Sequence, residues 1–549
     1  MRQRSATVLR TRRSVSLLSM ATGFIAACAI NTAAAQDEKL GELIPTMSIV
    51  YYAPDAGVEY QQSARVLIEA FKQLGLDIEL KPLQQSSMVS QIHVGGGLED
   101  LALGSWGGDP DRLDPNFWVV DLTACGMRRN ATKYCDEEYS AIAKEQAVTL
   151  DEDKRLELVW KAQEYAQKEL PWWLVAHRAN GLLYNSDRWE NLTIPAPIPP
   201  HETVLHPWLT MTPKGDDRIV DWAHFEDVST YNPLTEQTSQ GWLKFVYDSY
   251  VRFDGGDIVP WAVASWKPID DTTLELTLRE GMTFHDGKPV TTDDAVFSLN
   301  LMVEKQPPVL ADSLAGIENA EKVDDLTFRI NMAEPNPAIL RQGLTDLVIL
   351  PKHIWENVSD PMEWDPISDN GVIGSGPFAF ESWERNQQHV LKTFKDHWAA
   401  PAYDGLRRLS LGQADAIRAA MVDGTADIAT TVLPVATMEQ LGQSEDHLGF
   451  ELTPSFSTTT VWVNHEKAPF NDLQFRRALK FATDKERVAL EGWLGFAVPA
   501  GEGIVPTSLG KWHNTDLEVI PFDVDMAKQV LKDAGYGLDA DGRLHFPAQ

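Results

Sequence analysis

The arrangement of apolar and polar residues predicts a strand, a turn and a helix near the middle of the chain. Three leucines alternate with polar residues from Leu274 to Leu278, and this period of two predicts a strand with one buried face. Gly281 and Gly287 each follow an acidic residue in a pair typical of turns, because glycine accepts a positive φ without steric strain. Thr291 and Asp294 have the spacing of a capping box, so we expect a helix to start there.

Residues 36–200 alternate short apolar runs with amphipathic ones. The apolar runs predict strands at residues 48–52, 76–80, 100–104 and 173–176. Apolar residues spaced by three and four predict helices over 64–74 and 156–170, the second ended by Pro171. This rhythm of strands and helices predicts an α/β fold.

A cluster of prolines separates this part from the rest of the chain. Its members are Pro195, Pro197, Pro199, Pro200, Pro207 and Pro213. Proline removes a backbone donor and disfavours regular structure, so we expect a linker over residues 195–217. The length of 549 residues also predicts more than one domain.

Residues 1–35 have the pattern of an export signal. A basic start with Arg12-Arg13 precedes an apolar run, Val15 to Ile30, that is too short to span a bilayer comfortably. The arginine pair leaves the Sec and twin-arginine routes open. Cys28 fits a lipoprotein cleavage box, which would leave a lipid anchor. We favour cleavage after Ala35, which gives a periplasmic protein without a membrane-crossing segment.

The net charge argues against one class of partner. The chain has 48 basic and 80 acidic residues, a formal charge of −32, and 43% hydrophobic residues, as in a globular protein. A chain of this charge repels phosphate backbones, so no nucleic acid partner is expected.

Cys125 and Cys135 are the cysteines that such cleavage would leave. In an oxidising compartment, two cysteines ten residues apart favour a disulfide over a metal site. His353 and Glu356 lie one turn apart on an expected helix, but no third ligand is evident. We therefore expect no metal and no cofactor.

The stretch LREGMTFHDGKPVTTDDAVFSLN, residues 278–300, resembles the signature region of bacterial extracellular solute-binding proteins of family 5. These are the peptide-, nickel- and glutathione-type receptors of ABC importers. The resemblance implies a periplasmic-binding-protein fold with two lobes joined by a hinge. It also implies that dipeptide-binding members carry a similar local cysteine pair. His285 and Asp286 are expected to be structural.

The resembling segments occur in an unusual order. Residues 63–80, 106–115 and 155–177 resemble the family's C-terminal third, whereas residues 221–236 resemble its N-terminal start. Each segment appears once, so we favour a circular permutation over a fusion of mismatched halves. The permuted order predicts lobe II from 36–173 and 465–549, with lobe I continuous over 174–464.

The best candidate ligand site follows the expected strand near residue 103. Trp106 offers a flat apolar wall with one donor, and Asp109 a fixed charge that can hold an ammonium. The resemblance implies that Trp106 and Asp109 contact a peptide's backbone and amino end, with Ser105 and Gly107 beside them. Asp111 is a rival anchor, since the next Asp-Pro lies at Asp114-Pro115. On the residues alone, turn capping also explains these aspartates.

Residues 457–464 form a second candidate, because the resemblance implies that this segment of the first lobe meets the ligand. Thr459 and Trp462 are the expected contacts, although a plain β-branched strand explains the same residues. The pair Trp172-Trp173 is expected to pack in the core rather than line a pocket.

The resemblance implies a monomeric receptor that captures a short peptide and delivers it to the membrane permease of an ABC transporter. Glutathione or another amino-bearing solute, nickel, and a role as a peptide chaperone remain alternatives. A hydrolase is less favoured, because the chain has no G-x-S-x-G, H-E-x-x-H or Walker pattern. No catalytic residue is assigned.

Overall fold

The computed structural model describes residues 40–548 except 54–57, 94–95, 108–109, 193–204, 217, 226, 238–239, 255–256, 431 and 454–455. The expected leader, residues 1–35, and the alternative anchor Cys28 lie outside the described residues. Residues 40–549 form one compact unit. Within the described ranges, no helix has the length and apolar character needed to cross a membrane.

A six-stranded mixed sheet organises lobe II. In spatial order its strands are β2 Ile78–Leu83, β1 Met47–Tyr52, β3 Leu101–Trp106, β20 Thr458–Val463, β4 Trp172–Arg178 and β21 Ala497–Pro499. β1 pairs in parallel with β2 and β3, whereas β20 runs antiparallel to β3 and β4. Trp172 and Trp173 are buried in its core, as expected.

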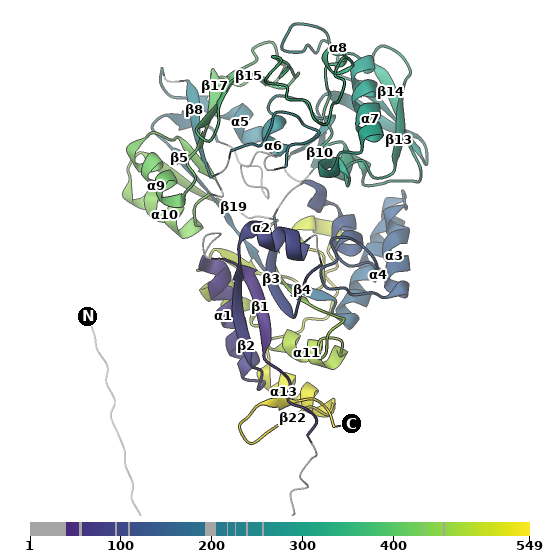
Figure 1. The fold of residues 1–549 in the computed structure, drawn as a ribbon, viewed down its shortest axis with the longest axis vertical. Coiled ribbons are helices and arrows are strands. Elements are labelled where there is room, and N and C mark those ends of the chain that lie inside the picture. The colour runs from purple at the N-terminus through teal and green to yellow at the C-terminus, as the bar shows by residue number, and fades with distance from the viewer. Residues whose placement is uncertain are drawn as a thin grey trace, which may run out of the picture. The chain divides into compact units, whose positions relative to one another are not determined.

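Helices from both ends of the described chain cover this sheet. They are α1 Val58–Lys72, α2 Gln85–Ser87, η2 Met88–His93, η3 Pro110–Leu113, η4 Phe117–Asp121, α3 Glu137–Ala147, α4 Glu152–Glu169, α11 Leu473–Phe481, α12 Lys485–Arg487, η7 Val488–Gly492, η8 Thr507–Trp512 and α13 Val524–Asp533. In Figure 1 the purple elements β1 and α1 and the yellow helix α13 belong to this lobe, and their buried residues share one hydrophobic core.

Lobe I contains a seven-stranded sheet and a four-stranded sheet. The first runs β15 Phe378–Glu384, β16 Gln388–Thr393, β17 Gly405–Ser410, β8 Ile219–His224, β18 Ile428–Thr430, β5 Asn180–Asn185 and β19 Leu448–Thr453. The second runs β11 Val263–Asp270, β12 Thr273–Leu278, β14 Thr327–Met332 and β13 Ile317–Lys322. Two-stranded ribbons pair β9 Val251–Asp254 with β10 Asp257–Pro260 and β6 Trp189–Glu190 with β7 Thr212–Pro213.

The helices of lobe I pack on these sheets. They are α5 His206–Thr210, α6 Gln240–Leu243, α7 Thr292–Lys305, η5 Pro308–Leu310, η6 Ile339–Gly343, α8 Lys352–Trp355, α9 Ala414–Asp423 and α10 Val435–Ser444. Helix α7 starts with the expected capping box between Thr291 and Asp294. His285 accepts from the amide of Gly374 and hydrogen-bonds the carbonyl of Gly376, and Asp286 lies 2.9 Å from His353. Both side chains therefore make structural contacts within lobe I, as expected.

The chain crosses between the two large sheets at two neighbouring places. β4 ends at Arg178 just before β5, and β19 precedes β20. β4 pairs with β20, and β5 pairs with β19. We expected Leu174 and the whole of β20 to lie in lobe I, so the boundaries placed at 173 and 464 need correction. Backbone hydrogen bonds to β3 hold β20 in lobe II.

Part of the expected linker is folded. Residues 193–204 lie outside the described residues, but α5 follows, and Leu205, Trp208 and Met211 are buried in the core of lobe I. Their spacing of three places all three on one side of the chain, which is why this proline-bearing segment packs instead of connecting freely.

The two ends of the described chain meet in lobe II. The amide of Gly41 donates to Phe546 (3.1 Å), and that of Ile44 donates to Leu544 (3.0 Å). The ribbon of β22 Gly537–Leu538 and β23 Leu544–His545 joins α13 to this contact. These ends therefore lie in the same lobe.

Candidate ligand-binding site

Trp106 is the centre of the candidate site. It ends strand β3, at the edge where the carboxyl ends of the parallel strands β1 and β3 meet, which is where α/β sheets bind ligands. Its ring lies 4.4 Å from that of His93 and 5.1 Å from that of Phe117. The side chain is only 6% exposed, and its indole nitrogen has no partner among the described residues.

Trp462 packs against the rings of Trp106 and His93. Its ring centroid lies 6.2 Å from that of Trp106 and 5.2 Å from that of His93. Gly104 makes the space: a Cβ at this position would lie 1.9 Å from the indole of Trp462. Trp462 is 3% exposed, so its indole is part of the buried aromatic packing around Trp106.

The remaining candidates differ in how the structure describes them. Ser105 and Thr459 are opposite each other on β3 and β20, and both hydroxyls are buried without a partner among the described residues. Gly107 follows β3 and is half-buried. Asp109 lies outside the described residues. Asp111 belongs to η3, and its side chain is likewise outside the description.

Two arginines approach the indole of Trp106, and sequence reasoning missed both. The guanidinium carbon of Arg112 lies 5.2 Å from the ring centroid, and that of Arg129 lies 6.0 Å away. Burial, aided by these two positive charges, lowers the pKa of His93 to about 3, so its imidazole is neutral near pH 7. Arg112 sits in the same segment as Trp106, which was the one local signal available.

A row of aromatic rings leads from Trp106 to a third arginine. Tyr52 hydrogen-bonds His93 (3.1 Å) and lies 4.8 Å from the ring of Tyr60, which in turn lies 5.0 Å from Trp493. The guanidinium carbon of Arg178 lies 5.7 Å from the ring of Trp493. Burial raises the pKa of Tyr52, so the phenol stays protonated.

A buried polar network holds the segment after Trp106. Asp114 accepts two hydrogen bonds from the guanidinium of Arg155, and Arg155 also donates to Gln146 (3.1 Å). Gln146 donates to Asn116 (2.9 Å), whose amide donates to Gln342 of η6 in lobe I (3.3 Å). The candidate segment is thus tied to both lobes.

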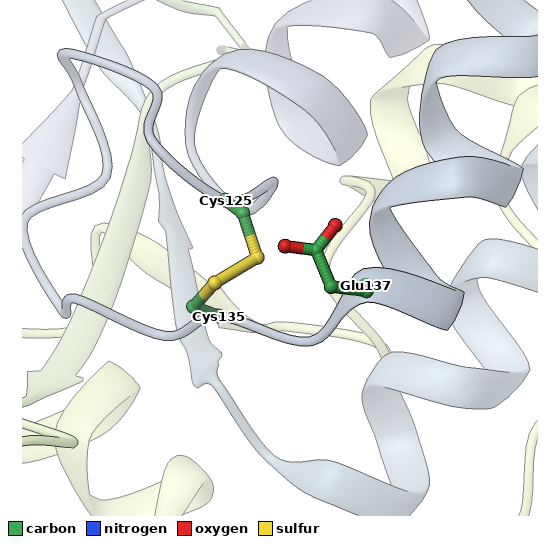
Figure 2. Close-up of side chains that lie close together, drawn as sticks. All are labelled: Cys125, Cys135 and Glu137. Carbon is green, nitrogen blue, oxygen red and sulfur yellow. A yellow bond between two sulfur atoms is a disulfide. The ribbon is translucent and has the colours of Figure 1, made fainter.

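The cysteine loop adds a second tie between the lobes. Cys125 and Cys135 form a disulfide, as expected (Figure 2). The loop that they close carries Arg129, whose guanidinium pairs with Asp312 of lobe I (2.6 Å). No local pattern predicts this ion pair, because Arg129 and Asp312 lie far apart along the chain.

Glu137 lies beside the disulfide, as Figure 2 shows. These three side chains form the one cluster of metal-ligand type found within the described ranges. Metal ions bind cysteine as the thiolate, and both sulfurs are used in the disulfide. The cluster is therefore not built as a metal site.

Comparison with known proteins places the chain among solute receptors. A family model described as "Bacterial extracellular solute-binding proteins, family 5 Middle" matches residues 257–548, more than half of the chain. Heme-binding protein A from Haemophilus influenzae is 25% identical over 348 residues, covering 57% of this chain and 59% of that protein. Oligopeptide-binding protein AppA from Bacillus subtilis is 27% identical over 350 residues, covering 60% and 62%. The matched part of the chain thus spans about three fifths of the length of each of these relatives.

Solved structures give a weaker likeness. NikZ from Campylobacter jejuni, in complex with Ni(L-His), has a TM-score of 0.47 and 20% identity, covering 60% of this chain and 65% of that one. A periplasmic oligopeptide-binding protein from Thermotoga maritima has a TM-score of 0.49 and 20% identity, covering 59% and 65%. Both scores lie under 0.5, so the assignment rests on the family match.

Proposed function

The chain belongs to the bacterial extracellular solute-binding proteins of family 5, and from this premise we propose that it captures a short peptide for an ABC importer. The peptide binds between the two lobes and is delivered to the membrane permease. Members of this family bind solutes and do not transform them.

The observation that carries the proposal is the position of Trp106. Its indole is a flat buried wall at the end of β3, and its N–H has no partner among the described residues. A buried donor without a partner destabilises a protein unless a ligand or water supplies an acceptor. Peptide carbonyls supply such acceptors in series, and the aromatic rings around Trp106 provide apolar contact.

Ligand-induced stabilisation tests this function. A ligand that binds only the folded state raises the unfolding temperature, and about a hundredfold excess over Kd contributes about 2.7 kcal/mol. We expect short peptides to raise this temperature and to be recovered unchanged by mass spectrometry. Stabilisation by free amino acids or sugars alone, with none by peptides, would show that the ligand class is different.

We expect Asp109→Asn to weaken binding of peptides with a free amino end. The carboxylate of Asp109 is proposed to hold the ligand ammonium, and loss of one partner of a desolvated charge pair costs about 2–5 kcal/mol. Isothermal titration calorimetry measures the change. N-acetylated peptides should bind the wild type weakly and change little in the variant. Equal affinity for free and acetylated peptides rejects the amine anchor, and Asp111→Asn then becomes the test of the rival residue.

We also propose that the family's segments occur here in circularly permuted order. Two facts support it: residues 41–44 and 544–546 are hydrogen-bonded, and the linear match to relatives covers only about three fifths of the chain. Joining Gln549 to Leu40 through a short flexible linker and opening the chain within 193–204 restores the family order. We expect this rearranged protein to match the original in unfolding free energy within about 1 kcal/mol, because the joined ends are already adjacent. Failure to fold in repeated designs would contradict the permutation.

A further inference from the structure

Arg178 lies at the crossing between the lobes and has no ionic partner among the residues that the structure describes. It ends strand β4, its Nε is buried, and it forms no hydrogen bond or ion pair with any described residue. Arg155, a buried arginine of the same lobe, pairs with Asp114. The chain is rich in acidic residues, and yet no described carboxylate pairs with Arg178. This missing partner requires an explanation.

Several other buried polar groups of lobe II also have no partner among the described residues. They are the indole nitrogen of Trp493 and the hydroxyls of Ser63, Ser105 and Thr459. Trp493 is 6% exposed, and the three hydroxyl residues are buried as well. Each such group needs a partner that the folded chain itself does not provide.

The strand register places these groups together. Thr459 pairs with Ala176 on β4 and with Ser105 on β3. Side chains alternate along a strand, so Arg178 shares the face of Ala176 and hence of Thr459. α1 and η7 pack together, since a Cβ on Gly492 would lie 2.4 Å from the hydroxyl of Ser63. The next residue, Trp493, has its ring 5.7 Å from the guanidinium carbon of Arg178.

The chemistry of this cluster selects one kind of ligand group. Arginine and tryptophan offer only donors, and hydroxyls donate where an acceptor is present. Glu59 in the first turn of α1 forms no ion pair with Arg178, so the guanidinium charge is not balanced there. A carboxylate carries several acceptor lone pairs and fits the fork of a guanidinium.

We propose that Arg178, together with Trp493, Thr459 and Ser105, binds a carboxylate of the captured solute. Arg178 and Trp493 lie at the end of the aromatic row away from Trp106, and Thr459 and Ser105 lie on the strands between them and Trp106. The chain therefore selects solutes that carry an acidic group. This inference rests on the proposed function, because it assigns the recognition of one ligand group within the same site.

Three peptide pools distinguish the origin of the carboxylate. The first contains tri- to pentapeptides with uncharged side chains and a free carboxyl end, and the second is the same pool amidated. The third is amidated and contains one glutamate per peptide. Retained peptides are identified by mass spectrometry after dialysis. We expect the wild type to retain the first pool about tenfold or more over the second. Retention of the third pool measures whether a side-chain carboxylate serves equally.

Arg178→Gln is expected to abolish the preference for the free acid. Arg65→Gln is the matched control, because it removes the same charge from an exposed position on α1 of the same lobe. The unfolding temperature without ligand separates binding from structure. Removal of an arginine that has no hydrogen-bond or ionic partner among the described residues should not lower this temperature, whereas removal of a structural arginine would.

The remaining outcomes are decisive in different ways. Equal retention of acid and amide by the wild type overturns the inference but leaves peptide binding standing. Retention of no pool rejects the peptide proposal, and glutarate then serves as the probe. If glutarate raises the unfolding temperature of the wild type but not of Arg178→Gln, the carboxylate site is supported. If glutarate does not stabilise the wild type, the carboxylate site is rejected. If Arg178→Gln does not fold, Trp493→Phe keeps the ring and removes the donor. An unchanged acid preference in that variant also overturns the inference.

Discussion

Deletion of residues 523–549 is expected to unfold lobe II and abolish ligand binding. The deleted segment contains α13, which packs on α11, and Leu531, Tyr536 and Leu544 are buried in the core of lobe II. Loss of three such side chains alone removes about 5 kcal/mol or more of burial, comparable to the whole stability of many domains. Limited proteolysis should cut lobe II first, and far-UV circular dichroism should show partial loss of structure.

A matched pair on the same helix controls for nonspecific effects. Leu531 is 2% exposed and Met526 is 45% exposed. Leu531→Ala should lower the unfolding free energy by about 2–5 kcal/mol, whereas Met526→Ala should change it little. If the truncated protein still bound ligand with native affinity, lobe II would not require the C-terminal segment, and our assignment of the two ends to one lobe would be wrong.

Asp114→Asn is expected to destabilise the protein by about 3–5 kcal/mol, because it leaves the guanidinium of Arg155 buried beside a neutral amide. The side chains of Arg155 and Asp114 are 5% and 3% exposed, so water cannot replace the lost charge. Denaturant unfolding measures the change. The same substitution should weaken binding, since Asp114 also accepts from the backbone N–H of Asn116 (2.9 Å) near the candidate site.

Two further variants show whether the buried pair is responsible. Asp153→Asn removes an exposed carboxylate from the first turn of α4 and should change stability by less than about 0.5 kcal/mol. Replacing both partners, as Asp114→Leu with Arg155→Met, should recover much of the loss, because neither charge is then left unpaired. A double variant as unstable as Asp114→Asn would point to packing of this segment, and not charge, as the cause.

Local patterns in the sequence were sufficient for features that depend on near neighbours. The strand from Leu274 to Leu278, the capping box at Thr291 and the disulfide between Cys125 and Cys135 all appear as expected. The strand depends on the alternation of its side chains, the capping box on contacts within one helical turn, and the disulfide on a short loop. The same logic failed between residues 205 and 211, where proline suggested a linker. There the apolar residues that bury against lobe I outweigh the local signal.

The sequence by itself determined the family signature, the α/β character and Trp106 as the centre of a candidate site. Tertiary structure alone decided which strands of each lobe meet and which cations surround that centre. Strands β4 and β20 belong to lobe II because their backbones pair with each other and β20 pairs with β3, not because of their composition. Arg178 and Trp493 come together from opposite parts of the chain. Such contacts join segments of lobe II that are far apart in the sequence, and neither residue type nor spacing carries that information.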